Sequence, residues 1–292
     1  MFKLMSSLAM AGAILFLTCA APAKATSITT FVSAKGTDSG TCAFPATPCR
    51  TFQFAINQTS AFGAVKVQDP AGYGPMTITK SISITGIEGA GINGSTGNAI
   101  TINAGPNDVV NLSHLILDGT MTANNGILLN SGGSLTITHC TIRNFVQRGI
   151  VPQPTAGKTT FLIADAFVLD NPGDGIGVIP QGVGLVQGTL DHVSMNKNGG
   201  DGLVIDGGFT SGSVGVRSVE SMANDNGIAG FVVGARAVLW LAHSAATGNN
   251  TGVSIALFTQ VISFGDNHIR GNNSDVIPTA LNRDLCPFSG SD

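Results

Sequence analysis

The sequence predicts an all-β fold, a single-stranded right-handed parallel β-helix of about eight to nine coils with a short N-terminal capping helix. Three observations predict it. A Gly-aliphatic pair recurs about every 25 residues, and a second series of short alternating segments runs in phase with it. No repeat contains a helical pattern of about ten residues, which argues against helical crossovers between the strands.

The first series consists of a Gly followed by an aliphatic residue. The aliphatic positions are Ile100, Ile127, Ile150, Ile176, Leu203, Ile228, Val253 and Val276. A unit of this length cannot bury its apolar face alone, so we expect the units to stack and form one continuous core. We also expect the repeating glycines to turn the chain at positions with positive φ.

The second series alternates apolar and polar residues and ends in Asn, as in SLTITHCTIRN (134–144) and TFLIADAFVLDN (160–171). Alternation over short runs is typical of strands with one buried face. The terminal asparagines are Asn144, Asn171, Asn198, Asn224, Asn249 and Asn272. In stacked coils these side chains form a column, which predicts a ladder of amides bonded to one another.

The composition fits a large aliphatic core. Hydrophobic residues make up 43% of the chain and charged residues 11%, whereas there is one Trp and one Tyr. This balance excludes a disordered chain. The formal charge is −3, and it falls to −5 if residues 1–25 are removed, because Lys3 and Lys24 leave without any acid. A mildly acidic protein without a basic patch is a poor nucleic-acid binder, so we expect no nucleic-acid partner.

The N-terminus predicts export to the periplasm or the exterior. Lys3 precedes a short apolar run, Leu8–Leu17, and Ala23-Lys24-Ala25 is a small-x-small cleavage site. We therefore expect a signal peptide cleaved after Ala25, with a retained anchor as the alternative. The apolar run is short for a membrane span, and we expect no span in the mature chain.

The remaining chain is expected to form one domain with a cap at its start. The segment RTFQFAINQTS (50–60) places Phe52, Ala55 and Ile56 at helical spacing, which predicts a short amphipathic helix over the first coil. The predicted boundaries are a strand, disulfide loop and helix over 26–62, the β-helix over 63–276 and a tail over 277–292.

Four cysteines remain after the predicted cleavage. Cys42 and Cys49 flank a short loop with two prolines, and in an oxidising compartment this pair is expected to form a disulfide. Cys140 is expected to be a small buried hydrophobic side chain. Pairing of Cys140 with Cys286 requires the tail to fold back along the domain and stays open.

Several segments resemble the pectin-lyase-like superfamily of right-handed β-helix proteins. TFVSAKGTDSGTCAFPATPCRTFQFAI (30–56) resembles the entry segment of bacterial secreted members, and VKVQDPAGYGPMTITKSISITG (65–86) resembles their first coils. The NGI and DGI repeats resemble the generic β-helix repeat. The resemblance implies the fold but no single activity, because members include polysaccharide lyases, glycosidases, esterases, epimerases and non-catalytic adhesins.

The residue before each repeating Gly forms the most interesting predicted column. Its members are Asn125, Arg148, Asp174, Asp201, Asn226 and Thr251. Asp174 and Asp201 would be neighbours on adjacent coils, where two carboxylates serve as acid and base, or as acid and nucleophile, on a glycosidic bond. They could instead hold Ca²⁺, or they could simply suit the turn, which favours Asp and Asn before Gly for backbone reasons.

Four further residues complete the candidate site. Arg148 would assist the two carboxylates by pairing with the carboxylate of a uronic acid. Asn125, Asn226 and Arg143 are the candidate substrate-binding residues. No zinc-type Cys/His spacing, phosphate loop or nucleophile elbow occurs, so no metal or cofactor is expected apart from the Ca²⁺ alternative.

A second column contains His114, His139, His192 and His243, with Ala166, Val219 and Asp266 expected at the equivalent places. A column that accepts Ala and Val predicts stacked turn side chains rather than a metal site or a base.

Three functions remain open on the sequence. The first is an exported protein that binds polysaccharide or cell-envelope glycan without a recognisable catalytic motif. Sugar binding usually uses exposed aromatic side chains, and Tyr73 and Trp240 are the candidates. The second is a glycoside hydrolase or lyase using Asp174 and Asp201. The third is a structural surface rod or adhesin. The substrate, the oligomeric state and whether the protein is an enzyme stay undecided.

Overall fold

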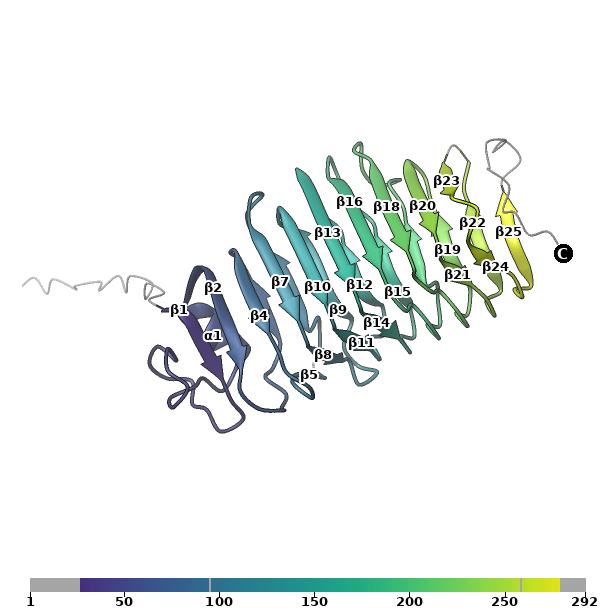
Figure 1. Ribbon diagram of the computed structural model, residues 1–292. Coiled ribbons are helices and arrows are strands. Elements are labelled where there is room, and N and C mark those ends of the chain that lie inside the picture. The colour runs from purple at the N-terminus through teal and green to yellow at the C-terminus, as the bar shows by residue number, and fades with distance from the viewer. Residues whose placement is uncertain (1–26, 95, 258, 279–292) are drawn as a thin grey trace, which may run out of the picture.

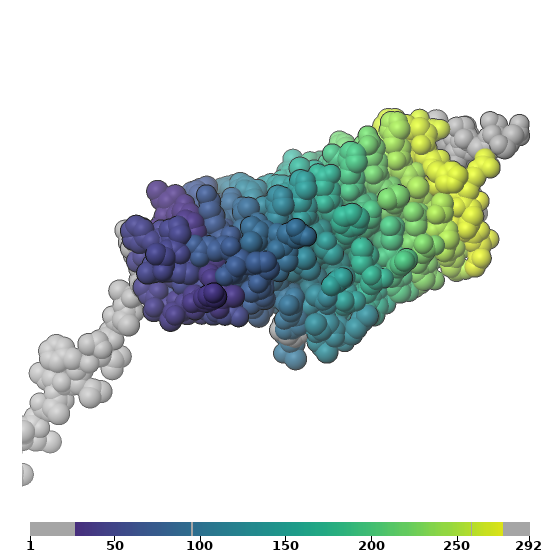
Figure 2. Space-filling view, turned by 60° about the horizontal axis from the view of Figure 1, so that its bottom comes forward, coloured from purple at the N-terminus to yellow at the C-terminus, as the bar shows by residue number. Residues whose placement is uncertain are grey.

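The chain forms a right-handed parallel β-helix, seen in a computed structural model that describes residues 27–94, 96–257 and 259–278 (Figure 1). Each coil contributes a strand to each of up to three parallel sheets. We call them sheets A, B and C in the order in which a complete coil, such as β4, β5 and β6 (residues 82–103), passes through them. The coils follow one another along the rod in chain order, as the colour bands of the space-filling view show (Figure 2). The fold predicted from the repeat is confirmed.

Sheet A has ten strands and sheet C has nine. The strands of sheet A are β1 (Ser27–Val32), β2 (Thr59–Val67), β4 (Ile82–Thr85), β7 (Val109–Ser113), β10 (Ser134–Thr138), β13 (Lys158–Ala164), β16 (Leu185–Asp191), β18 (Val214–Val219), β20 (Ala237–Ala242) and β23 (Gln260–Ser263). The strands of sheet C are β3 (Met76–Ile78), β6 (Ile100–Asn103), β9 (Asn125–Ser131), β12 (Arg148–Pro152), β15 (Asp174–Val178), β17 (Leu203–Ile205), β19 (Ala229–Val233), β22 (Thr251–Ile255) and β25 (Ser274–Pro278).

Sheet B is narrower and is made of two groups of strands. They are β5 (Gly91–Asn93), β8 (Ile116–Asp118), β11 (Thr141–Arg143) and β14 (Phe167–Leu169), and then β21 (Ala245–Ala246) and β24 (His268–Ile269). Single bridges join the two groups, from Phe167 to Ser194, from Ser194 to Met222 and from Met222 to Ala245. Sheet B therefore runs without a break along one side of the rod.

The alternation of the sequence places the apolar side chains inside. In β10 the side chains of Leu135 and Ile137 are buried, whereas those of the intervening Ser and Thr residues are partly exposed. The aliphatic column of sheet C follows the prediction from Ile100 to Leu203 and again at Val253 and Val276. Burial of these stacked rows is the main force that holds the coils together.

One member of the predicted aliphatic column is wrong. Leu203 pairs with Phe231, which is fully buried, whereas Ile228 is 54% exposed at the corner before the strand. The coil that begins at Leu203 is three residues longer than its Gly-Ile pattern suggests. Gly227-Ile228 matches the repeat in sequence but lies in a turn. The core position is filled by an aromatic side chain instead.

The repeating glycines are required by space rather than by positive φ. None of Gly149, Gly175 or Gly202 lies in the left-handed region. A Cβ atom on Gly175 would lie 2.6 Å from the carbonyl oxygen of Gly202 and 2.8 Å from Nδ2 of Asn198. The expectation that these glycines turn the chain is therefore wrong, and the left-handed corner positions are occupied largely by other residues.

The N-terminal cap closes the first coil as predicted. Helix α1 (Phe52–Gln58) buries Phe52, Ala55 and Ile56 against the first strands, and the Thr51 side chain accepts a hydrogen bond from the N–H of Phe54 at its start. The preceding loop carries a Cys42–Cys49 disulfide. Cys140 is a free and buried cysteine, whereas Cys286 and the predicted signal peptide lie outside the described residues.

The side chain of Gln53 in α1 forms hydrogen bonds with the backbone of an edge strand, as a neighbouring strand would. Its Oε1 accepts a hydrogen bond from the N–H of Thr77 at 2.7 Å, and its Nε2 lies 3.4 Å from the carbonyl oxygen of the same residue. Thr77 belongs to β3, the first strand of sheet C. The side-chain amide thus satisfies both backbone groups of an edge that no strand covers.

Candidate functional site

The corner between sheets B and C holds a buried ladder of asparagines. Its members are Asn171, Asn198, Asn226, Asn249 and Asn272. In each step the backbone N–H and the side-chain amide of one residue both donate to Oδ1 of the next, as from Asn198 to Asn226 at 3.0 Å in each case. The ladder was predicted, but not all of its members.

Two predicted ladder members are wrong. Asn144 donates to Asp118, and the ladder position of its coil belongs to Phe145, whose N–H donates to Oδ1 of Asn171. Asn224 lies in a second, partly exposed row, where its N–H donates to Oδ1 of Asn196. A turn with two Asn residues, such as Asn224 and Asn226, does not reveal which of them points inward, because either choice gives nearly the same spacing.

Asn226 is therefore not part of the predicted substrate column. It belongs to the buried ladder, with a side chain that is 2% exposed. The register of β17 with β19 places Ala229 beside Asp201 instead, and Ala229 in turn pairs with Thr251. The prediction that Asn226 shares the column of Asp174 and Asp201 is wrong for the same reason as the prediction for Ile228.

The structure brings Arg148, Asp174 and Asp201 together as predicted. Arg148 pairs with Asp174 across the sheet, and its Nε donates to Oδ2 of Asp174 at 2.8 Å. The other oxygen of Asp174 accepts the backbone N–H of Asp201 at 3.1 Å. Asp201 in turn accepts the N–H of Ala229 at 2.8 Å. Each carboxylate thus also serves as a link to the next coil.

The two carboxylates differ in their electrostatic surroundings. Burial raises the pKa of Asp201 to about 6, and the negative charge of Asp174 adds to this effect, whereas the N–H of Ala229 and the charge of Arg148 oppose it. A carboxyl group with a raised pKa next to a second carboxyl group is an arrangement that suits acid–base chemistry. The same geometry is unfavourable for Ca²⁺, because the Arg148 guanidinium already neutralises Asp174.

The side chains of Asn125 and Arg143 form their hydrogen bonds with other residues. Asn125 is 8% exposed, and its amide donates to Asn98 and Gln147. Arg143 lies on sheet B, where its Nε donates to Oδ2 of Asp118 at 2.9 Å. Neither side chain reaches the Asp174–Asp201 pair through a hydrogen bond.

The outer face of sheet A carries the half-exposed Trp240. The pairing register places it between Arg217 and Ile262 in a row of outward side chains. The Arg217 guanidinium lies over the indole ring at 4.9 Å from its centroid, a cation–π contact. On the same strand pair, the indole edge lies against the backbone of Gly215, whose missing side chain leaves room for it. We call Trp240 and Arg217 the tryptophan site.

A hollow of about 560 Å³ adjoins the tryptophan site. Val238 and Gln260 line it, and both lie on the outer face of sheet A next to Trp240 along or across the strands. Arg236 and Ser213 line it from the loops that enter the sheet. The lining of the hollow thus includes one arginine and one side-chain amide, and Trp240 lies two residues beyond Val238 on the same strand and face.

Tyr73, the other aromatic candidate, is fully buried. Its hydroxyl donates to Asp69, and its ring packs against Phe52 of the cap. It supports the first coil and is not available to a ligand.

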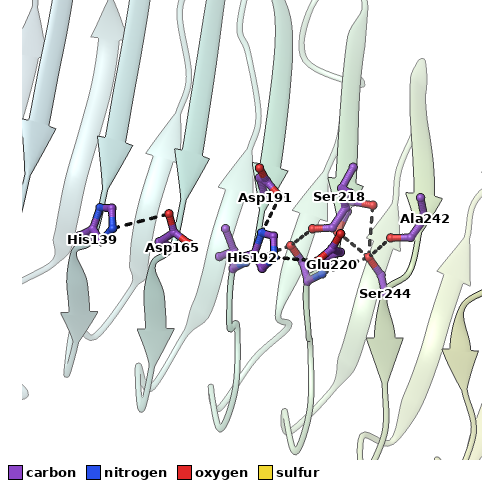
Figure 3. A network of polar contacts seen from close by, with 11 residues as sticks. His139, Asp165, Asp191, His192, Ser218, Glu220, Ala242 and Ser244 are labelled. Atoms are coloured by element: carbon purple, nitrogen blue, oxygen red, sulfur yellow. Dashed lines mark hydrogen bonds and ion pairs between the residues drawn. The ribbon is translucent and has the colours of Figure 1, made fainter.

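The corner between sheets A and B holds a row of alternating bases and acids, which we call the charge row (Figure 3). Its members are His139, Asp165, His192, Glu220, His243 and Asp266, of which Figure 3 labels the first four. The first five have positive φ between 47° and 53°. The predicted equivalents Ala166 and Val219 are therefore off by one residue, and the true members are Asp165 and Glu220.

The charge row is exposed and joined by ion pairs. Nε2 of His192 lies 2.6 Å from Glu220, and Nε2 of His243 lies 3.0 Å from Asp266. His139 stands 3.7 Å from Asp165 and stacks on His114, with ring centroids 4.8 Å apart. A hydrogen bond to the carboxylate of Asp191 and the negative charge of Glu220 raise the pKa of His192.

Within the described residues, no group of three or more His, Cys, Asp or Glu side chains is arranged to hold a metal ion. Across the same part of the chain, no helix has both the length and the apolar character needed to cross a bilayer.

Comparisons with known proteins yield neither a matching family model nor a matching curated protein. Two solved structures are similar in fold. The crystal structure of pectate lyase Pel9A is 13% identical, with 91% of this chain and 84% of that chain covered and a TM-score of 0.48. The A-module of the Azotobacter vinelandii mannuronan C-5 epimerase AlgE4 is 12% identical, with coverages of 74% and 89% and a TM-score of 0.32. These likenesses concern the course of the chain and not its chemistry.

Proposed function

We propose that this protein is exported and binds a polysaccharide on the outer face of sheet A, at the tryptophan site. The observation that carries the proposal is the partly buried indole of Trp240, which lies on the outer face of sheet A next to the hollow. An aromatic ring offers an apolar surface to the C–H face of a sugar, while hydroxyl groups of the sugar meet polar side chains around it.

Two arginines favour a polysaccharide with carboxylate groups. Arg217 lies over the indole, and Arg236 lines the neighbouring hollow. Arginine binds carboxylates through two parallel hydrogen bonds, which gives both strength and orientation. A chain containing uronic acids would meet an aromatic ring and a guanidinium within the same short stretch of sheet.

The test is binding to a panel of uronate-containing and neutral polysaccharides, measured by affinity electrophoresis. We expect Trp240→Ala to weaken binding at least about tenfold, and Arg217→Gln to weaken binding of the acidic members selectively. Phe44→Ala is the matched control, because Phe44 is an exposed aromatic residue on the disulfide loop. If the wild-type protein binds none of the panel, or Trp240→Ala binds as well as wild type, the proposal fails.

A second candidate function, cleavage of a polysaccharide, rests on Asp201. A carboxyl group with a pKa of about 6 is partly protonated near neutral pH and can act as a general acid, and the Asp174 carboxylate beside it is paired with Arg148. Release of reducing or unsaturated ends from the same panel tests it. Cleavage by wild type that persists in both Asp174→Asn and Asp201→Asn removes this candidate. Absence of both binding and cleavage leaves the structural rod.

The Cys42–Cys49 disulfide supports export, because such bonds persist in oxidising compartments. We propose that the signal peptide is cleaved after Ala25. Expression of the full chain in a bacterium, followed by the intact mass of the exported protein, tests the proposal. A mature chain that begins at Thr26 is expected, and a product retaining Met1 in the membrane fraction contradicts it.

A further inference from the structure

We propose that two copies of this chain associate side by side and antiparallel, through the charge row and the outward row of sheet B next to it. The proposal goes beyond glycan binding, because the tryptophan site lies on sheet A and takes no part in the contact. Two observations carry it, and both come from the order of side chains along the rod.

The first observation is the sign pattern of the charge row. Read from the N-terminal end, its six members alternate strictly between imidazole and carboxylate. A row of even length that alternates in sign is complementary to itself when it is reversed. Two antiparallel rods with a two-fold axis between the coils of His192 and Glu220 therefore bring opposite charges together along the whole row.

The pairs follow from the numbering of the coils. His192 of one copy faces Glu220 of the other, and the symmetry makes this contact twice. Asp165 faces His243 in the same way, and His139 faces Asp266. The spacing matches automatically, because both rows follow the inter-strand distance of about 4.8 Å. A parallel arrangement would not preserve this pairing.

The second observation is the size pattern in sheet B. Its outward row, which is two residues further along each coil, reads Thr141, Phe167, Ser194, Met222, Ala245 and His268. The side chains of Phe167 and Met222 are 51% and 42% exposed. Small residues lie beside them, with Ser194 between the two large side chains and Ala245 next to Met222.

The same two-fold axis places each large side chain over a small one. Phe167 of one copy meets Ala245 of the other, and Met222 meets Ser194. Two exposed apolar side chains thus find complementary depressions without any shift of register. The charge row and the sheet B row are independent patterns, yet they are self-complementary about one and the same axis.

The imidazoles are surrounded by acids, so protonation strengthens the contact. His192 faces Asp191 from the end of β16, Glu220 from the corner after β18 and Asp165 from the preceding coil. His243 faces Asp266, and His139 faces Asp165 on one side and His114 on the other. Within each copy these pairs are exposed, and a partner would add a second acid to each base and exclude water.

The contact is short, which sets the expected affinity. The six coils from His139 to Asp266 span roughly 24 Å at the usual inter-strand spacing. An interface of this length and two rows in width is small, so we expect a weak dimer with a dissociation constant in the micromolar range. The dimer should form better at pH 6 than at pH 8.5, and better at low salt than at high salt.

The first experiment is disulfide trapping in a Cys286→Ser background. We expect Phe167→Cys mixed with Ala245→Cys to give a cross-linked dimer under mild oxidation at pH 7, whereas neither variant alone does so. Phe167→Cys mixed with Ser194→Cys is the control, because the proposed register keeps these positions about 10 Å apart. Equal cross-linking in both mixtures, or none in the first, overturns the proposal.

The second experiment is sedimentation of the wild-type protein and two charge variants at pH 6. We expect His192→Glu to raise the dissociation constant about tenfold and the swap His192→Glu with Glu220→His to restore it. Both residue types already occupy the left-handed backbone of this row, so the variants are expected to fold. A wild-type protein that is monomeric at all concentrations, or a swap that fails to restore the dimer, contradicts the proposed pairing.

Discussion

The two corners that follow sheets A and B solve the same stacking problem with different chemistry. At the corner after sheet B, buried asparagines repeat one neutral amide in every step. At the corner after sheet A, exposed side chains alternate between imidazole and carboxylate. Burial accounts for the difference, because an isolated charge is costly in the interior, whereas an amide can donate to one neighbour and accept from the other.

The comparison shows that the contribution of a ladder to stability depends on whether water can solvate the groups that lose a partner. An amide ladder that loses a member leaves buried groups without partners. An exposed ion pair that loses a member leaves groups that water solvates, so its effect on the monomer is small. The buried corner should therefore dominate stability at every pH, and the exposed corner should respond to pH and to a partner.

The largest expected effect is that of Asn198→Ala. The Asn198 amide donates to the carbonyl of Val168 and to Asn226, and its oxygen accepts two hydrogen bonds from Asn171. Removing it should lower the free energy of unfolding by about 3 kcal/mol, measured by urea denaturation. Asn250→Ala, which removes an exposed amide two coils further along the rod, should change stability by less than about 0.5 kcal/mol. Equal losses in the two variants would show that burial is not the deciding factor.

Asp201→Asn should have an intermediate effect on the free energy of unfolding and, unlike Asn198→Ala, should raise it. The pKa of Asp201 is raised from 3.8 to about 6, so the folded state holds its proton more tightly than the unfolded state. Stability therefore falls as the pH rises from about 4 to about 6. The variant lacks this penalty and should be about 1 kcal/mol more stable than wild type at pH 8, with little difference at pH 4.

Urea denaturation at the two pH values checks this expectation for Asp201. Asp174→Asn is the informative partner variant, because it removes the negative charge that faces Asp201 but also leaves Arg148 unpaired. A destabilisation by Asp201→Asn that is the same at pH 4 and pH 8 would mean that packing, and not charge, governs this position.

The smallest expected effect is that of His192→Asn on the thermal stability of the monomer. The pKa of His192 is raised by Asp191 and Glu220, so its contribution to stability is present below the unfolded pKa of about 6.5 and is lost as the pH rises through the folded pKa. We expect a small decrease in Tm at pH 5.5 and none at pH 8.5. His114→Asn, which replaces an imidazole stacked on His139, is the control. A decrease of equal size at both pH values would contradict the ion-pair origin.

The sequence was sufficient to predict the fold because the repeat consists of apolar side chains that must be buried. The column from Ile127 to Leu203 has one apolar residue per coil, and no other pairing buries them all. It was insufficient where two residues satisfy the same spacing. Ile228 and Phe231 both follow a turn, and only the packing of the core selects Phe231.

The candidate sites were predictable to different degrees. Arg148, Asp174 and Asp201 come together because they share a coil position with a regular period. The charge row was missed, because Asp165 and Glu220 are one residue away from the positions that simple counting assigns. Alternation of sign over several coils was the signal that could have revealed it, had the left-handed corner position been aligned in every coil.

The amide of Gln53 has a consequence for the growth of the rod. Because it occupies the hydrogen-bonding groups of Thr77 with a single side chain, the first strand of sheet C offers no template on which an added chain could extend the sheet. Gln53, one residue of a seven-residue helix, is therefore expected to disfavour head-to-tail addition of a second rod to sheet C at this end.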